Sequence, residues 1–153
     1  MQMTPDKKKN KLYIVVPCYN EEQVLGETSK RLKIKCENLI QKGQISKDSK
    51  IVFVDDGSKD RTWKMISELH ETDSLFSGVK LSRNRGHQNA LLAGLTMASE
   101  HADMAISMDA DLQDDINAVD QMIEKYYEGC DIVYGVRSAR ETDTFFKRFT
   151  AEA

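Results

Sequence analysis

Residues 50–60 have the sequence KIVFVDDGSKD, in which a short, mostly apolar run is followed directly by acidic and polar residues. The apolar part, Lys50–Val54, is short and rich in β-branched residues, which predicts a strand buried on both faces. The same arrangement occurs at Leu12–Val16, where LYIVV is followed by PCYNEE. A buried strand that ends in a polar segment is therefore a unit that the chain uses more than once.

Further strands and helices alternate along the rest of the chain. We expect strands at Gly78–Leu81, Ala102–Met108 and Asp131–Val136. We expect helices at Glu21 to Lys42, at Arg61–Glu71 (with Ser58 or Asp60 as its N-cap), at His87–His101 and at Ile116–Tyr127. Buried strands separated by helices predict an α/β fold with three layers, in which a Rossmann-like, mostly parallel sheet carries helices on both faces. The final residues, FFKRFTAEA, predict the opening of another amphipathic helix, so we expect the chain to be truncated at its C-terminus.

The size and composition are those of one soluble domain. The chain has 153 residues and a net charge of −3, which gives no reason to expect nucleic acid as a partner. We expect residues 1–11 to form a disordered basic tail and residues 12–153 to form the domain. The scattered cysteines predict free thiols in a reducing compartment, and no apolar stretch approaches the ~20 residues of a membrane helix. The expected location is the cytoplasm.

A polar segment follows each of the five expected strands. These segments are residues 17–22, 55–60, 82–86, 109–115 and 135–137. Because the carboxyl ends of parallel strands meet at one edge, where open α/β folds bind ligands, we expect a ligand site there. Asn20 and Arg83 are candidate substrate-binding residues because they lie in two of these segments.

The segment that follows the fourth strand predicts a metal site. If the chain stays extended past Met108, the side chains of Asp109, Asp111 and Gln113 project from one side. Hard oxygen ligands that leave coordination positions open suit Mg²⁺ or Mn²⁺ shared with substrate phosphates. The alternative is that Asp114 or Asp115 caps the next helix and the other acids are solvated, which leaves Asp109 and Asp111 unexplained.

A second acidic pair, Asp55 and Asp56, ends the second strand. Adjacent strand residues point to opposite faces, so we expect one of the two carboxylates to face the ligand, where it accepts hydrogen bonds from a nucleobase imide or a ribose hydroxyl. The alternative is a simple Asp-Gly turn in which Asp56 satisfies backbone amides. Arg83, Arg85 and Arg137 are available to contact phosphate oxygens.

The start of the third helix has two interpretations. His87 is placed to approach a phosphate, but it is also an ordinary polar residue of a first helical turn. No Ser-His-Asp or Cys-His arrangement and no zinc-ligand spacing is present in the sequence.

Five motifs together resemble the GT-A fold family 2 glycosyltransferases. They are VVPCYNEE (15–22), VFVDDGSKDRT (52–62), LSRNRGHQNALLAGL (81–95), MDADLQDD (108–115) and, more weakly, GVR (135–137). The form of these motifs looks most like the branch of dolichol-phosphate mannose synthase and the bacterial undecaprenyl-phosphate glucosyltransferases. The proline that usually follows DLQD is replaced by Asp115-Ile116, which puts the start of the next helix in doubt.

The resemblance implies a role for each matching position. Pro17, Tyr19 and Glu21 would border the nucleoside, and Asp56 or Asp55 would bind the base or ribose. The metal and the diphosphate would be held by Asp109, Ala110, Asp111 and Gln113, with Arg137 near the pyrophosphate. The metal ligands would be Asp109, Asp111 and Gln113.

The expected function is therefore a metal-dependent, inverting transfer of a hexose from a UDP- or GDP-sugar to a polyprenyl phosphate or a glycan hydroxyl. A general base is not identified. The full-length form would be associated with the cytoplasmic face of the membrane, and its oligomeric state is left open. The alternatives are a nucleotide-binding but catalytically silent module, and a sugar-phosphate nucleotidyltransferase. After its first strand, a nucleotidyltransferase would need a glycine-rich phosphate loop and a dehydrogenase would need the motif GxGxxG. Residues 17–22, which follow the first strand here, contain no glycine, and this disfavours both classes of enzyme.

Overall fold

The fold divides into two compact units. A computed structural model of the chain describes residues 10–113, 115–137 and 147–152, with the backbone alone described at residues 136, 137 and 147–152. The first unit ends at Gln113 and the second begins at Asp114. Of the predicted basic tail, only Asn10 and Lys11 lie within the described residues.

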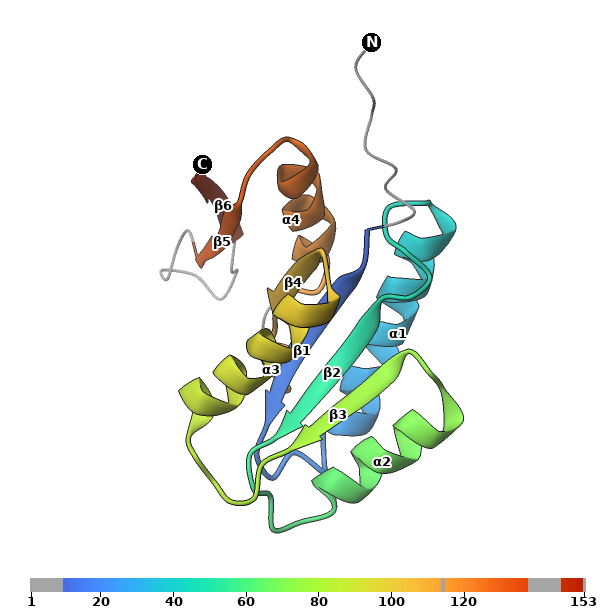
Figure 1. The fold of residues 1–153 in the computed structure, drawn as a ribbon, viewed down its shortest axis with the longest axis vertical. Coiled ribbons are helices and arrows are strands. Elements are labelled where there is room, and N and C mark those ends of the chain that lie inside the picture. The colour runs from blue at the N-terminus through green and yellow to red at the C-terminus, as the bar shows by residue number, and fades with distance from the viewer. Residues whose placement is uncertain (1–9, 114, 138–146, 153) are drawn as a thin grey trace. The chain divides into compact units, whose positions relative to one another are not determined.

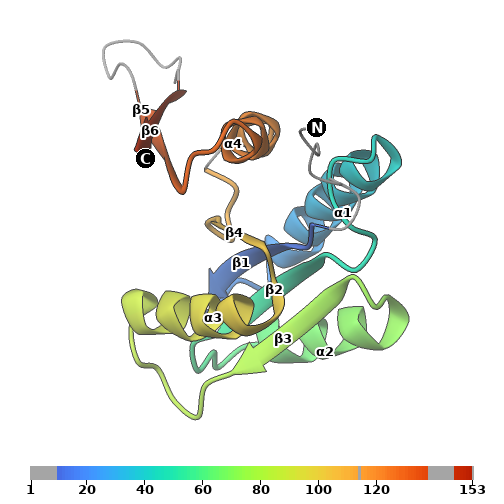
Figure 2. The ribbon, with the colours of Figure 1, turned by 45° about the horizontal axis from the view of Figure 1, so that its top comes forward.

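The first unit contains a four-stranded parallel sheet with the strand order β3-β2-β1-β4. Its strands are β1 (Leu12–Cys18), β2 (Lys50–Asp55), β3 (Phe76–Lys80) and β4 (Met104–Ser107). Its helices are α1 (Leu25–Gln41), α2 (Thr62–Thr72) and α3 (His87–His101). In this unit α1 and α2 cover one face of the sheet and α3 covers the other (Figures 1 and 2). The predicted α/β architecture, a parallel sheet with helices on both faces, is therefore confirmed.

The core follows the alternation of strand side chains. Tyr13 and Val15 of β1, together with Val52 and Val54 of β2, pack on the α3 side of the sheet around Ala90 and Ala98. The residues between them point to the opposite face, where Phe53 stacks on Phe76 with ring centroids 6.1 Å apart. Every residue of β1 is buried. This explains why the strand has a continuous apolar run, since a central strand buries both of its faces.

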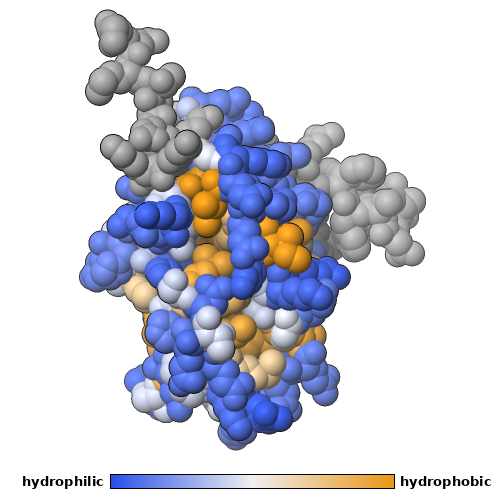
Figure 3. Space-filling model, turned by 90° about the vertical axis from the view of Figure 1, so that its right-hand side faces the viewer, coloured by the Kyte–Doolittle hydropathy of each residue, from blue (hydrophilic) through white to orange (hydrophobic). Residues whose placement is uncertain are grey.

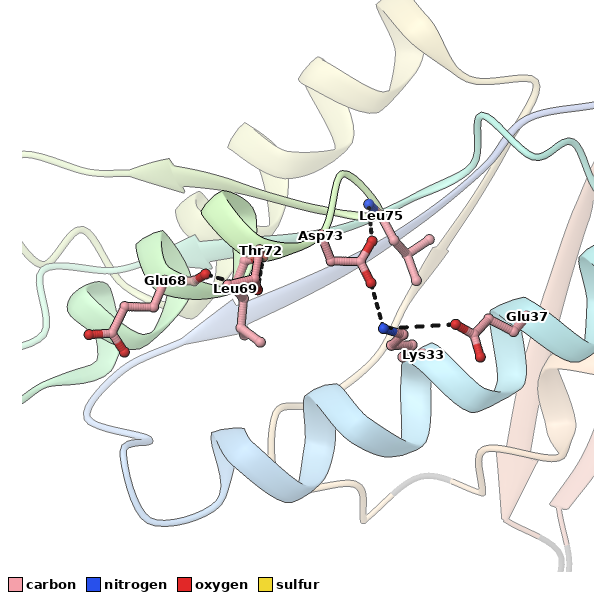
Figure 4. Close-up of polar contacts among 7 residues, drawn as sticks. All are labelled: Lys33, Glu37, Glu68, Leu69, Thr72, Asp73 and Leu75. Carbon is pink, nitrogen blue, oxygen red and sulfur yellow. Dashed lines mark hydrogen bonds and ion pairs between the residues drawn. The ribbon is translucent and has the colours of Figure 1, made fainter.

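Polar contacts join the end of α2 to the middle of α1 (Figure 4). The ammonium group of Lys33 lies 2.7 Å from Asp73 Oδ2 and 3.9 Å from Glu37 Oε1. Asp73 Oδ1 also accepts the Leu75 N–H at 2.9 Å. The hydrogen bond from Lys33 is the main reason why the pKa of Asp73 lies below its usual value. This partly exposed ion pair fixes the direction in which the chain leaves α2, although surface pairs add little to stability.

The element boundaries differ from the sequence prediction at helix starts and also at strands, since β3 begins at Phe76 rather than at Gly78 and β4 is shorter than the predicted strand at both ends. The first helix begins at Leu25, because the Glu21 carbonyl accepts the N–H groups of Val24 and Leu25 in a preceding turn. Neither predicted residue is the N-cap of α2, which is Arg61 without a side-chain cap hydrogen bond. Asp60 accepts the Thr62 N–H at 2.9 Å from the preceding position, and the Ser58 hydroxyl accepts the Asn20 N–H. The helix α3 has the predicted bounds.

The second unit corrects two predictions. It contains α4 (Ala118–Tyr127), β5 (Ile132–Arg137) and β6 (Lys147–Glu152). The strand β5 pairs with β6 in a separate antiparallel sheet, so the expectation of five strands in one parallel sheet is wrong. The predicted C-terminal helix is also wrong, because the backbone of β6 finds its hydrogen-bond partners on β5 rather than within a helical turn.

On the face drawn in Figure 3, hydrophobic surface lies in patches between hydrophilic side chains. Among the helices of the described residues, none combines the length and the apolar character that crossing a bilayer requires.

A close contact between α3 and the sheet yields the first prediction. A Cβ at Gly94 would lie 2.3 Å from Val15 Cγ1 and 2.9 Å from Val54 Cγ2. Both valines are stiff, β-branched core residues, so Gly94→Ala should lower the free energy of unfolding by about 1–3 kcal/mol despite the better helix propensity of alanine.

The matched control is Gly26→Ala in α1, where a Cβ would meet nothing within 4 Å. This variant should be neutral or more stable by up to about 1 kcal/mol. Urea unfolding of the three proteins measures the effect, and equal stability of Gly94→Ala and Gly26→Ala would contradict the close packing of α3.

Candidate functional site

A pocket of about 400 Å³ lies in the first unit, at the carboxyl ends of β1, β2 and β4 and the start of α3. Its walls contain residues from four polar segments of the sequence. Together with His87 and Ala90 of α3, the wall residues are Pro17, Cys18, Tyr19, Glu21, Asp56, Asn84, Gly86, Asp109, Ala110 and Asp111. The structure therefore brings seven of the predicted site residues together at one edge of the sheet. Of the others, Asn20, Asp55, Arg83 and Gln113 are not in the wall, and the side chain of Arg137 lies outside the described residues.

The loop that follows β1 is tied to the loop that follows β2. The Asn20 N–H donates to Ser58 Oγ at 2.9 Å, and Asn20 Oδ1 accepts the Lys59 N–H at 2.8 Å. The next residue, Glu21, donates its N–H to Thr62 Oγ1 at 2.9 Å. Asn20 has a φ of 52°, a conformation that asparagine tolerates better than most residues. Asn20 thus holds the two loops together, and this leaves Tyr19 and Glu21 on the pocket wall.

The acidic pair at the end of β2 divides between two environments, as strand alternation predicts. Asp56 lines the pocket, and its Oδ1 accepts the Arg85 N–H at 2.7 Å. Asp55 is completely buried and accepts the Ser58 N–H at 3.2 Å through Oδ1. Asp55 Oδ2 has no hydrogen-bond partner within the described part of the chain. Asp56 therefore satisfies a backbone amide, as the alternative interpretation held, and also presents a carboxylate to the pocket.

Gly57 explains how the β2 and β3 loops approach each other. Its φ is +72°, and a Cβ there would lie 2.4 Å from the Asn84 nitrogen and 2.6 Å from the Arg83 carbonyl carbon. Only glycine allows a backbone contact this close. The contact places Asn84 in the pocket wall, which Arg83 and Arg85 do not line, although all three residues are exposed. The sequence prediction named Arg83 and missed Asn84, although the turn glycine was the available signal.

The segment that follows β4 forms a turn, so the predicted extended conformation past Met108 is wrong. Pairing with β1 ends at Ser107, after which the Leu112 N–H donates to the Asp109 carbonyl at 3.2 Å. The Gln113 N–H donates to Asp111 Oδ1 at 3.2 Å. Asp109 and Asp111 share the pocket because of this turn and not because of strand alternation, and the turn takes Gln113 out of the wall.

Negative charge accumulates on one side of the pocket. The pKa of Glu21 is raised, first by partial burial and then by the charges of Asp111, Asp60 and Asp109. Burial is also the main cause that raises the pKa of the neighbouring Cys18 thiol, which argues against a nucleophilic thiolate. Such a concentration of carboxylates favours a cation as part of any ligand.

These residues fit a cation that a ligand helps to hold. In the described ranges, no three His, Cys, Asp or Glu side chains converge closely enough to hold a metal ion on their own. The two carboxylates of Asp109 and Asp111 nevertheless line one open pocket, and Mg²⁺ commonly takes one or two carboxylates and completes its shell with substrate phosphates and water.

The start of α3 also contributes to the pocket wall. Gly86, His87 and Ala90 line it, and no side chain caps this helix. The uncapped N–H groups and the positive end of the helix favour an anion, such as a phosphate, that lies between them and a cation. His87 is a residue of the first turn and also lines the pocket, so its position is compatible with both interpretations that the sequence left open.

The model of the family described as "Glycosyl transferase family 2" matches residues 13–152. The chain belongs to glycosyl transferase family 2. The resemblance that the sequence motifs indicated is therefore confirmed, including the branch, since proteins named for transfer to bactoprenol and undecaprenyl phosphate are among the relatives.

Two curated members of glycosyl transferase family 2 illustrate the similarity. The uncharacterized glycosyltransferase YkoT of Bacillus subtilis (strain 168) is 56% identical over 140 residues, which are 92% of this chain and 42% of that protein. The prophage bactoprenol glucosyl transferase homolog of Escherichia coli (strain K12) is 40% identical over 142 residues, which are 93% of this chain and 44% of that protein. This chain thus spans less than half the length of these relatives.

Solved structures support the GT-A fold. The mannosyltransferase PcManGT from Pyrobaculum calidifontis, in complex with GDP-Man and Mn²⁺, matches 67% of this chain and 28% of its own chain. The TM-score is 0.52 at 25% sequence identity.

The charges around Glu21 yield a prediction of pH dependence. Because its pKa is raised in the folded protein, the folded state binds more protons at this site than the unfolded state between the two pKa values. The stability that Glu21 contributes is therefore present below the unfolded pKa and is lost as the pH rises through the folded pKa. Glu21→Gln should stabilise the protein relative to wild type near pH 7 and have little effect near pH 4, about the lower end of this window.

Urea unfolding at both pH values, in the presence of a chelator, measures this difference. Glu71→Gln on α2 is the matched control for loss of an exposed carboxylate. An effect of Glu21→Gln that is the same at both pH values would contradict the assignment.

Proposed function

We propose that this chain binds a UDP- or GDP-hexose together with Mg²⁺ or Mn²⁺, and that the whole protein transfers the hexose with inversion to a polyprenyl phosphate. The observation that carries the proposal is that Asp56, Asp109 and Asp111 line one pocket with the uncapped start of α3. The pocket therefore contains carboxylates that can bind a cation and helix N–H groups that can bind an anion. A metal–diphosphate ligand requires both.

Each wall has a proposed part in binding. Pro17 and Tyr19 border the nucleoside, and Asp56 accepts hydrogen bonds from the base or ribose through the oxygen that Arg85 does not engage. Asp109 and Asp111 would hold the cation, which would offset the negative charge of the diphosphate. Arg137 and Gln113 remain candidates for contact with the diphosphate or the metal on the basis of the sequence resemblance alone.

The chemistry is a displacement at the anomeric carbon. An acceptor oxygen forms a bond to this carbon from one face while the bond to the diphosphate oxygen on the opposite face breaks, and the leaving nucleoside diphosphate keeps the electron pair. A bound Mg²⁺ or Mn²⁺ neutralises charge on that leaving group. A phosphate monoester has a second pKa of about 6, so such an acceptor is already anionic at neutral pH and needs no strong general base.

The relatives support this choice of substrates. The Escherichia coli protein is named as a homolog of a bactoprenol glucosyl transferase, and the Pyrobaculum structure holds GDP-Man and Mn²⁺. We infer from these names that the acceptor is a polyprenyl phosphate rather than a glycan hydroxyl, and that the full-length protein acts at the cytoplasmic face of a membrane.

A second candidate is a chain that binds the nucleotide without transferring sugar. It is favoured by the fact that the chain spans 42% of the length of YkoT. An assay of the full-length protein with donor and undecaprenyl phosphate distinguishes the two, because nucleotide binding without product in that protein is the outcome expected of the second candidate.

Donor class is tested by thermal stabilisation with a panel of nucleoside diphosphates and Mn²⁺. A ligand at about 100 times its Kd stabilises the folded state by about 2.7 kcal/mol. We expect UDP or GDP to raise the Tm and CDP and ADP to have a smaller effect. Equal or absent shifts for all four would contradict a selective nucleotide site.

Asp111→Asn tests the role of the carboxylate pair. It removes a charge from the pocket while keeping the side-chain shape, so it should abolish the Mn²⁺-dependent part of UDP or GDP affinity in isothermal titration calorimetry. Glu68→Gln, an exposed residue of α2, removes one carboxylate outside the pocket and should bind as wild type does. Unchanged metal-dependent affinity of Asp111→Asn would count against the proposed site.

A further inference from the structure

A buried hydroxyl on α1 reaches the acidic turn. Thr28 is 2% exposed, and its Oγ1 donates to the carbonyl of Ala110 at 2.5 Å. Ala110 is the residue between Asp109 and Asp111, and all three line the pocket. The hydrogen bond therefore joins a helix on one face of the sheet to the point midway between the two pocket carboxylates.

The bond fixes the orientation of one peptide group. A trans peptide is planar, so its C=O and N–H point in opposite directions, and the described residues contain no cis peptide bond. When Thr28 holds the Ala110 carbonyl, the direction of the following Asp111 N–H is also set. The hydrogen bond thus restrains the peptide group between Ala110 and Asp111, and through it the backbone that carries the two aspartates.

The turn needs such a constraint for two reasons. Leu112 has a φ of 53°, a left-handed conformation that costs a non-glycine residue energy and persists only where surrounding contacts hold it. In addition, Asp109 and Asp111 lie near Glu21, whose pKa their charges raise, so like charges favour opening of the turn. The pairing of β4 with β1 ends at Ser107 and does not extend to this segment.

We propose that Thr28 is a positioning residue, whose hydroxyl holds the Asp109–Asp111 turn in the conformation that presents both carboxylates to the cation and diphosphate. The identity of the ligand in this inference rests on the proposed function. The restraint on the turn rests only on the observed hydrogen bond between Thr28 and Ala110. Thr28 does not line the pocket and acts only through the Ala110 carbonyl.

Three variants of the 153-residue chain separate this role from simple packing. Thr28→Val keeps the shape and removes the donor, which leaves a buried carbonyl unsatisfied. Thr28→Ser keeps the donor, and Thr28→Ala removes donor and methyl without adding bulk. Ser29→Ala is the matched control, because Ser29 is also buried in α1 but its hydroxyl donates to Gly26 within the helix at 2.9 Å.

The first readout does not depend on any ligand. Hydrogen exchange of the Leu112 and Gln113 amides, both bonded within the turn, should be roughly three- to tenfold faster in Thr28→Val and Thr28→Ala than in wild type, as expected for loss of one hydrogen bond. Thr28→Ser and Ser29→Ala should exchange at the wild-type rate. Wild-type exchange of these amides in folded Thr28→Val and Thr28→Ala would overturn the proposal.

The second readout is UDP or GDP affinity with Mn²⁺ and with EDTA. Thr28→Val should lose roughly three- to tenfold in the Mn²⁺-dependent affinity and little in EDTA, and Thr28→Ser should restore it. If wild type binds and Thr28→Val binds equally well, only the role of Thr28 is overturned. If wild type itself binds no nucleotide, the proposed function fails, and the part of Thr28 in ligand binding fails with it.

Discussion

The parallel pairing of β1 with two neighbours is the constraint on which the rest of the structure depends. Cys18, the last residue of β1, lies opposite Asp55 of β2, and Val15 lies opposite Ser107 of β4. In this register the polar segments that follow the three strands begin at the same edge of the sheet. A slip of one residue would turn every strand side chain to the opposite face and displace these polar segments, so the geometry of the pocket depends on this register.

The loops at this edge are held by contacts between loops rather than by the strands alone. Asn20 joins the first loop to the second, and the close approach at Gly57 joins the second to the third. Thr28 reaches the fourth from α1. These contacts are polar or depend on a glycine, and they keep carboxylates close to one another against their repulsion. Geometry that brings together like charges in this way is costly to stability and is typical of a ligand-binding site.

The lining of the pocket combines two kinds of electrostatic character. It contains the carboxylates of Asp109 and Asp111 together with the uncapped start of α3, which includes His87. A ligand that carries both a cation and phosphate oxygens satisfies both, whereas a neutral ligand satisfies neither. Membership of glycosyl transferase family 2 agrees with such a ligand, and the chain contains the part of the family fold in which this pocket lies.

The sequence by itself determined the strand–helix alternation, the α/β class, the family and most of the polar residues at the sheet edge. This was possible because apolar runs and short motifs involve residues that are close together in the sequence. It also predicted that Asp55 and Asp56 would face different environments, since strand alternation is a local property. Only the tertiary structure decided that Asp109 and Asp111 meet through a turn, that Asn84 and His87 join the wall, and that β5 pairs with β6. These features depend on contacts between residues that are distant in the sequence, such as Thr28 with Ala110 and Gly57 with Asn84. Local sequence patterns do not predict contacts of this kind.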